Sequence, residues 1–294
     1  MLRGRRARSR RQYDGEGMTG SYEAGGARLA YSVRGAGVPV VFLHPTPIDG
    51  FYWQPMLEEL GGVRGVVPDL RGHGASELGT ELPVGGFVRV PDAPVLTMER
   101  HAKDVLALMD HLQLDQAVWA GCSIGGSVVM ELWRQAPERA LGLAIICTKP
   151  QADAEANLER RVATIAAARA GETENIFNGM AHSLVGQSAQ KRRPEIVAEL
   201  RARMTIKAET LVAVQAGLAT RPNSVPTLAT MSVPVLAIMG GEDPGTTRAE
   251  MEVYNAAPGG CEFHLMADAG HFAAYEQPGR VAALMAEWLR RRVA

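Results

Sequence analysis

Short apolar runs alternate with helical patterns along most of the chain. Runs that predict buried strands lie at 38–43, 63–68, 117–122, 141–147, 233–239 and 262–266. Between and after them, apolar residues recur with helical spacing over 98–112, 126–135 and 280–292. Strands that alternate with helices are typical of a parallel sheet covered by helices on both faces. The pattern therefore predicts an α/β fold built on a mostly parallel, doubly wound sheet.

Two segments depart from this alternation. Residues 21–37 resemble a β-hairpin that turns at Gly25 and Gly26. Residues 150–226 are rich in Ala, Arg and Glu, have helical spacing and contain few strand formers, which predicts an inserted helical cap. The expected organisation is a tail at 1–20, a core made of 21–149 and 227–294, and the cap at 150–226.

The first residues differ in composition from the rest. Six arginines stand at positions 3, 5, 6, 8, 10 and 11, and no apolar stretch follows them. This composition favours a disordered basic tail over a signal peptide. Because Met18 is also a reasonable first residue, we consider residues 1–17 a candidate start-codon artefact.

Composition and charge narrow the function classes. The 294 residues are 46% apolar, which allows one large domain with an insertion or two smaller domains. A net charge of −1 gives no indication of a nucleic-acid or membrane partner, and no apolar run reaches the roughly 18 residues that span a bilayer. Three cysteines without metal-ligand spacing favour a reducing, cytoplasmic compartment. We expect a small-molecule substrate and leave homo-oligomer formation open.

The stretch Gly-Cys-Ser-Ile-Gly at 121–125 lies between a predicted strand and a predicted helix. A serine at such a turn is raised above the sheet edge, and the positions two before and two after it must be nearly bare. Gly121 and Gly125 meet this requirement. The start of the helix also directs backbone N–H groups at negative charge that forms there. Ser123 is therefore the predicted nucleophile.

Cys122 is the rival nucleophile. Moving the motif back by one residue would place Ala120 and the branched Ile124 at the positions that must be small. Ile124 fits badly there. We therefore expect Cys122 to be the last inward-facing residue of the strand.

A serine hydroxyl needs a base to remove its proton and an acid to orient that base. Asp243 and His271 follow the predicted strands at 233–239 and 262–266, at the carboxyl ends where open sheets place their sites. Asp153 is the alternative acid, and His73 is the alternative base, which we interpret as bracing a turn. The neighbouring acids are expected to point away, and the other histidines to be structural or solvated: Glu242 and Asp268, and His101, His111, His182 and His264.

An oxyanion intermediate needs N–H donors aimed at its charge. The backbone N–H of Ile124, directly after the nucleophile, is one predicted donor. The loop His44-Pro45-Thr46-Pro47 follows the strand at 38–43, and its prolines carry no N–H. Thr46 is therefore the second predicted donor, on a loop that His44 supports.

These motifs make the chain resemble the α/β-hydrolase fold superfamily over residues 21–294. The order Ser, Asp, His is the order of that superfamily, and residues 69–76 resemble its loop after the fourth strand. Residues 148–153, followed by Arg160 and Arg161, are similar to the branch with 3-oxoadipate enol-lactonase-like and haloperoxidase/esterase-like enzymes. The resemblance implies a serine hydrolase that cleaves a small carboxylic ester or lactone, with no cofactor and no metal.

Other functions share this scaffold. A cofactor-free C–C bond hydrolase, a thioesterase or a perhydrolase would use the same triad. A small-molecule binding protein without turnover would not need Asp243 and His271 in register. The sequence therefore favours an enzyme and leaves its bond specificity open.

The chain departs from the superfamily pattern at two places. Pro45 stands where most relatives have glycine, and the loop at 77–96 is longer than usual, which predicts a flap over the site. The flap and the cap are expected to set substrate choice. Arginines 160, 161 and 169 of the cap either pair with glutamates 155, 159 and 172 on a solvated face or turn one guanidinium inward to bind a substrate carboxylate.

Overall fold

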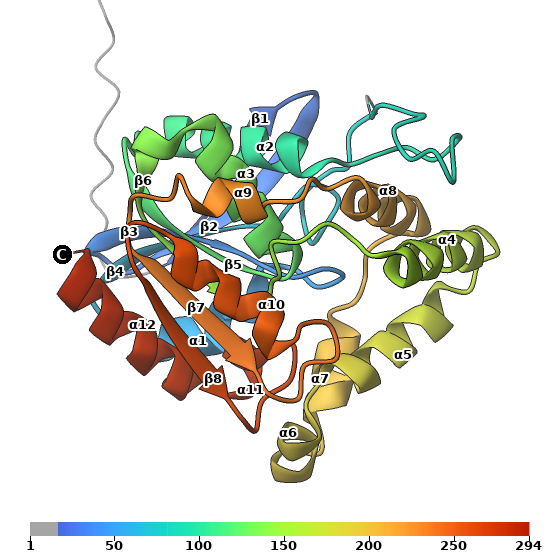
Figure 1. Ribbon diagram of the computed structural model, residues 1–294. Coiled ribbons are helices and arrows are strands. Elements are labelled where there is room, and N and C mark those ends of the chain that lie inside the picture. The colour runs from blue at the N-terminus through green and yellow to red at the C-terminus, as the bar shows by residue number, and fades with distance from the viewer. Residues whose placement is uncertain (1–16, 81, 294) are drawn as a thin grey trace, which may run out of the picture.

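The computed structural model describes residues 17–80 and 82–293, so most of the expected tail lies outside the described residues. The described chain forms an eight-stranded sheet in the order β1-β2-β4-β3-β5-β6-β7-β8 (Figure 1). The strands are β1 (Met18–Ala24), β2 (Ala27–Arg34), β3 (Val38–Leu43), β4 (Val63–Pro68), β5 (Ala117–Cys122), β6 (Ala140–Ile146), β7 (Val235–Gly240) and β8 (Cys261–Met266).

The predicted hairpin opens the sheet. Strands β1 and β2 pair antiparallel, with Ala24 opposite Ala27. Gly25 and Gly26 form the turn with φ of 47° and 71°, values that glycine adopts without steric cost. Strand β1 begins at Met18, inside the span that we expected to be tail. The predicted hairpin is therefore present and starts three residues earlier than expected.

The remaining strands make the sheet mostly parallel, as the sequence predicts. Strand β2 pairs antiparallel with β4, and every pair from β4 to β8 is parallel. Side chains of β3 alternate between two cores: Val40 and Phe42 pack on one face, and Val41 and Leu43 on the other. Because both faces are covered, β5 is buried at every position.

Helices cover both faces (Figure 1). The face with Val40 packs against α1 (Gln54–Glu59), α11 (Ala273–Glu276) and α12 (Pro278–Arg292). The face with Val41 packs against α2 (Met98–His111), α3 (Ile124–Gln135) and α10 (Arg248–Glu252). Short 3₁₀ turns lie at Gly50–Trp53 (η1), Pro137–Arg139 (η2) and Val253–Ala256 (η3). The helices predicted at 98–112, 126–135 and 280–292 are thereby confirmed within two residues.

A helical segment, residues 150–226, connects β6 to β7 and lies beyond the carboxyl ends of the parallel strands (Figure 1). It contains α4 (Glu155–Arg169), α5 (Thr173–Leu184), α6 (Gln187–Arg192), α7 (Ile196–Ala202) and α8 (Ala208–Ala219), and α9 (Val225–Leu228) begins at its end. Helix α4 packs on α8, and α5 packs on α7.

The loop at 77–96 does not form the expected flap over the site. Its described residues pack on the helical segment: Leu96 donates its N–H to Ala213 of α8 at 3.0 Å, and Arg89 pairs with Glu155 of α4. Phe87 and Val95 are buried in the same core as α4. Apolar side chains in this loop explain the difference, because they need a helical face to cover them.

Candidate active site

The backbone at Ser123 adopts a strained turn. Its φ of 56° and ψ of −120° lie outside the regions open to most residues, and such a conformation costs about 1–3 kcal/mol. A Cβ on Gly121 would lie 2.3 Å from the carbonyl carbon of Gly125, and one on Gly125 would lie 2.1 Å from the carbonyl oxygen of Leu43. The two glycines are therefore required by close backbone contacts, as the motif predicts.

Cys122 faces the interior, as expected. Its sulfur accepts a hydrogen bond from the Tyr52 hydroxyl at 3.3 Å and lies 3.5 Å from the carbonyl oxygen of His271. Burial raises the pKa of the Cys122 thiol well above its ordinary value, and it does the same for Cys147 at the end of β6. A nucleophilic cysteine needs the opposite shift. These thiols are packing groups.

His271 and Asp243 form a buried pair. The imidazole Nδ1 lies 2.9 Å from the Asp243 carboxylate, and the backbone N–H of His271 donates to the carbonyl of Leu184 at 2.8 Å. The N–H of Gly245 and the hydroxyl of Thr246 also donate to Asp243, at 2.7 Å and 2.6 Å. Because Nδ1 donates to the carboxylate, the other ring nitrogen, Nε2, is left as the acceptor.

Each member of this pair shifts the pKa of the other. Burial opposes a charged imidazole, but the charge and hydrogen bond of Asp243 outweigh it and raise the pKa of His271. Burial likewise opposes the Asp243 carboxylate, and His271, Thr246 and Gly245 outweigh it and lower the pKa of Asp243. Shifts of this kind stabilise the imidazolium that a general base becomes.

The loop after β3 rests on two neutral histidines. His44 accepts the N–H of Leu70 on Nε2 at 2.9 Å, and His73 accepts the hydroxyl of Thr46 on Nε2 at 2.9 Å. Nδ1 of each ring faces a backbone carbonyl oxygen. Burial lowers the pKa of His44 to about 4 and that of His73 to about 3. His73 therefore braces a turn, as we interpreted it, and does not act beside Asp243.

One cavity of 480 Å³ contains most of these groups. Its lining includes Thr46, Ser123, Ile124 and His271, which come from loops at the carboxyl ends of β3, β5 and β8. Asp243 lies behind His271 and is buried. The residues singled out in the sequence are thus gathered at one edge of the sheet, under the helical segment.

The alternative acid, Asp153, occupies a different place. It lies between the guanidinium groups of Arg161 and Arg221 and makes ion pairs with both. Sequence reasoning missed Arg221, which lies in a loop with no motif around it, and Lys149, which lines the same cavity and pairs with Glu250 at 2.8 Å.

The expected glutamate partners of the arginines on α4 are wrong. Arg161 pairs with Asp153, Arg169 pairs with Asp92 at 3.1 Å, and Arg160 bonds Asn157. For Glu155 and Arg169 the reason is geometric, because Arg89 and Asp92 of the long loop at 77–96 pair with them. Arg160 and Arg161 line the cavity, and Arg169 does not.

Three carboxylates join the helical segment to the loops after β7 and β8. Glu242 accepts the N–H of Ser188 at 2.8 Å, and so points away from His271 as expected. Glu276, which the sequence analysis did not single out, accepts N–H groups of Gly270 at 2.7 Å, Phe272 at 3.1 Å and Gly186 at 3.2 Å. Asp268 pairs with Arg192 and Arg280 at the surface.

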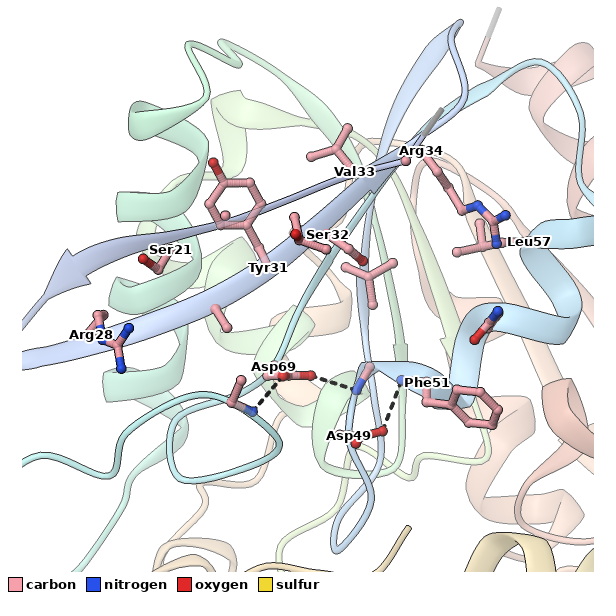
Figure 2. A pocket seen from close by; sticks show the side chains of 18 residues that line it. Ser21, Arg28, Tyr31, Ser32, Val33, Arg34, Asp49, Phe51, Leu57 and Asp69 are labelled. Carbon is pink, nitrogen blue, oxygen red and sulfur yellow. Dashed lines mark hydrogen bonds between the residues drawn. The ribbon is translucent and has the colours of Figure 1, made fainter. Parts of the chain in front are cut away.

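A second hollow of 740 Å³ lies along β2 and the loops after β3 and β4 (Figure 2). Its two carboxylates are used by their own loops: Asp49 accepts the N–H of Phe51 at 3.1 Å, and Asp69 accepts those of Gly50 and Ala75, each at 2.9 Å. None of Ser123, Asp243 and His271 lines it. The 480 Å³ cavity is therefore the candidate active site.

Among residues 17–80 and 82–293, no cluster of three or more His, Cys, Asp or Glu side chains is arranged to hold a metal ion. Within the same residues, no helix combines the length and apolar character needed to cross a bilayer.

Comparisons with known proteins agree with this architecture. Residues 40–284 match the alpha/beta hydrolase family. A thermophilic esterase from Thermogutta terrifontis, solved with malate bound, is 31% identical, with a TM-score of 0.82 over 91% of this chain and 95% of that one.

Two curated relatives are also similar. The 3-oxoadipate enol-lactonase 2 of Acinetobacter baylyi is 30% identical over 71% of this chain and 72% of its own length. A putative non-heme haloperoxidase of Mycobacterium phage D29 is 30% identical over 42% of this chain, and the match spans 40% of that protein. Together with the strand order and the Ser123 turn, these matches show that the chain belongs to the alpha/beta hydrolase family.

Proposed function

We propose that this protein is a serine hydrolase that cleaves small carboxylic esters or lactones through an acyl-enzyme. The observation that carries the proposal is the positive φ of Ser123 at a strand–helix turn, on the same cavity as the His271–Asp243 pair. The similarity to an esterase and to an enol-lactonase supports the choice of bond.

In this mechanism His271 takes the proton of the Ser123 hydroxyl as its oxygen attacks the carbonyl carbon. Asp243 holds the ring and stabilises its charged form. The tetrahedral intermediate then collapses, its C–O bond to the alcohol breaks, and His271 passes the proton to the leaving oxygen. A water molecule, deprotonated by His271, then attacks the acyl carbon. The bond from this carbon to the Ser123 oxygen breaks, His271 returns the proton to that oxygen, and the acid leaves.

The backbone N–H groups of Thr46 and Ile124 are the proposed donors to the oxyanion. Ile124 begins α3, so its N–H has no acceptor within the helix. The hydroxyl of Thr46 is held by His73, and this contact fixes the loop after β3 against the next turn. Both residues line the cavity beside Ser123.

Replacing the nucleophile tests the proposal. Ser123→Ala should lower kcat on p-nitrophenyl esters by a factor on the order of 10⁴–10⁶, because triad members act as a unit. The melting temperature should not fall, because the alanine removes a hydroxyl from a strained turn. A fluorophosphonate probe should label the wild type at Ser123 alone.

Labelling at Cys122, or full activity in Ser123→Ala, would contradict the assignment. A panel of esters, lactones, acyl-thioesters and C–C substrates separates the proposed reaction from the others that this scaffold supports.

A further inference from the structure

Two guanidinium groups share one carboxylate in the wall of the active-site cavity. Arg161 donates to one oxygen of Asp153, and Arg221 forms an ion pair with the other at 2.9 Å. The three side chains are nearly enclosed, with 17%, 9% and 2% of the surfaces of Arg161, Arg221 and Asp153 exposed. One carboxylate neutralises one guanidinium, so the cluster carries an excess positive charge in a place where water screens it poorly.

The rest of the wall does not balance this charge. Lys149 is paired with Glu250 at 2.8 Å, which makes that pair neutral. Arg160 bonds only Asn157 and adds a further cation at the cavity wall. Among the described residues that line the cavity, Asp153 is the single acidic side chain. The wall of the cavity that Ser123 also lines is therefore cationic.

The cluster also keeps unused hydrogen-bond donors. Arg161 donates through Nη1 to the side-chain oxygen of Gln215 at 2.8 Å, which leaves its Nη2 without a partner among the described residues. Nε of Arg221 likewise has no hydrogen-bond partner among the described residues. Burial opposes ionisation of Asp153, but Arg161 and Arg221 outweigh it and lower its pKa. Asp153 thus stays charged at neutral pH.

We propose that the cavity selects esters or lactones that carry a free carboxylate, which binds the Arg161–Arg221 cluster. Guanidinium groups bind carboxylates through charge-assisted, often bidentate, hydrogen bonds. A cavity of 480 Å³ suits a small organic acid ester. The proposal rests on the proposed function for the reacting end of the substrate only, and the anion site itself is independent of turnover.

Binding to the inactive Ser123→Ala variant tests the anion site directly. The probes are monomethyl succinate and methyl succinamate, which have the same shape and differ by one negative charge. Calorimetric titration should show the acid binding at least tenfold more tightly, with the preference shrinking as NaCl is raised. Equal affinity for the two probes, or no binding of the acid, overturns the proposal.

Variants that change the charge of the cluster test its origin. Arg161→Met leaves Asp153 and Arg221 as a neutral pair, so the ratio of affinities, acid over amide, should fall at least tenfold in the Ser123→Ala background. Arg221→Met should lower the same ratio, because it leaves Asp153 and Arg161 as a neutral pair. Arg169→Met is the matched control, because Arg169 lies on the same helix and pairs with Asp92 away from the cavity. A loss in the control as large as that in Arg161→Met overturns the proposal.

Turnover by the wild-type enzyme separates this proposal from the proposed function. If neither ester nor any member of the ester and lactone panel is cleaved while the acid still binds selectively, the hydrolase assignment falls and the anion site stands. If acid and amide are cleaved with equal kcat/KM and bind equally, the hydrolase assignment stands and the anion site falls.

Discussion

The proton of His271 is subject to opposing influences. Burial favours the neutral ring, whereas the negative charge of Asp243, 2.9 Å away, favours the charged ring and prevails. A general base must be neutral before it can act. In the proposed mechanism, in which His271 is the general base, the pH at which the enzyme becomes active reports the balance between the two influences.

We expect kcat/KM to fall on the acid side with a midpoint above the ordinary histidine pKa of about 6.5, because His271 gains its proton there. Asp243→Asn should move the midpoint down and lower kcat by about 10⁴. The measurement is a pH–rate profile on a substrate for which chemistry is rate-limiting. A profile that stays flat down to about pH 5 would point to another base.

Single residues differ in how far the sequence reveals them. Gly121 and Gly125 could be predicted because the turn motif itself requires bare positions there, although the backbone that excludes a Cβ at Gly125 belongs to Leu43 of β3. Arg221 could not be predicted, because its place in the cluster depends on its ion pair with Asp153. Asp153 lies 68 residues earlier and meets Arg221 only after the helical segment folds back. Charge excess in a cavity is a property of tertiary contacts, and a linear pattern does not carry it.

At the scale of elements, one carboxylate holds the loop between β8 and α11. Glu276 accepts N–H groups from Gly270 and Phe272, the residues on either side of His271, and from Gly186 of the helical segment. Its charge also raises the pKa of His271. We therefore propose that Glu276 is a positioning residue that acts on His271 through the loop.

Glu276→Gln should lower kcat by about 10-fold to 100-fold with a smaller change in KM, because the amide cannot accept all three N–H groups. An unpaired buried donor costs about 1–3 kcal/mol of stability. The acid limb of the pH–rate profile should move to lower pH, because a negative charge near His271 is lost.

Glu242→Gln is the matched control, since Glu242 also binds the helical segment but does not contact the N–H groups beside His271. An equal shift of the acid limb in both variants would assign the effect to the helical segment as a whole.

Elements with strong local patterns were predictable and those set by distant partners were not. Strand β5 and helix α2 combine unbroken apolar spacing with clear ends, and their predicted bounds agree with the structure within one residue. The loop at 77–96 was predicted to form a flap over the site, but none of its described residues lines the cavity. It packs on α4 and α8, which the sequence identified only as helical.

The whole molecule contains buried histidines that must stay neutral. Burial lowers the pKa of His44 to about 4 and that of His73 to about 3. In an unfolded chain the same residues bind protons near pH 6.5. Below that pH the unfolded state therefore binds more protons than the native state does. Linkage then requires the free energy of unfolding to fall as the pH falls.

Between pH 6.5 and 4.5 we expect these histidines to lower the free energy of unfolding. For His44 the full loss, on the order of 3 kcal/mol, is reached below its native pKa of about 4. His73→Asn should show a shallower loss than the wild type over this range in urea titrations. His182→Asn, which changes an exposed histidine, is the control. Identical slopes for the wild type and His73→Asn would contradict the expectation.

The buried thiols near Ser123 make the native protein unreactive towards alkylating reagents, and this property can be used to time its opening. Cys122 and Cys147 are enclosed at the ends of β5 and β6, and burial raises the pKa of both. Alkylating reagents attack thiolates, and Cys147 lines the active-site cavity, so Cys122 is the thiol that reacts only after the centre of the sheet has opened. With Cys147 and the half-buried Cys261 replaced by serine, the rate of iodoacetamide labelling of Cys122 measures how often the end of β5 separates from its neighbours.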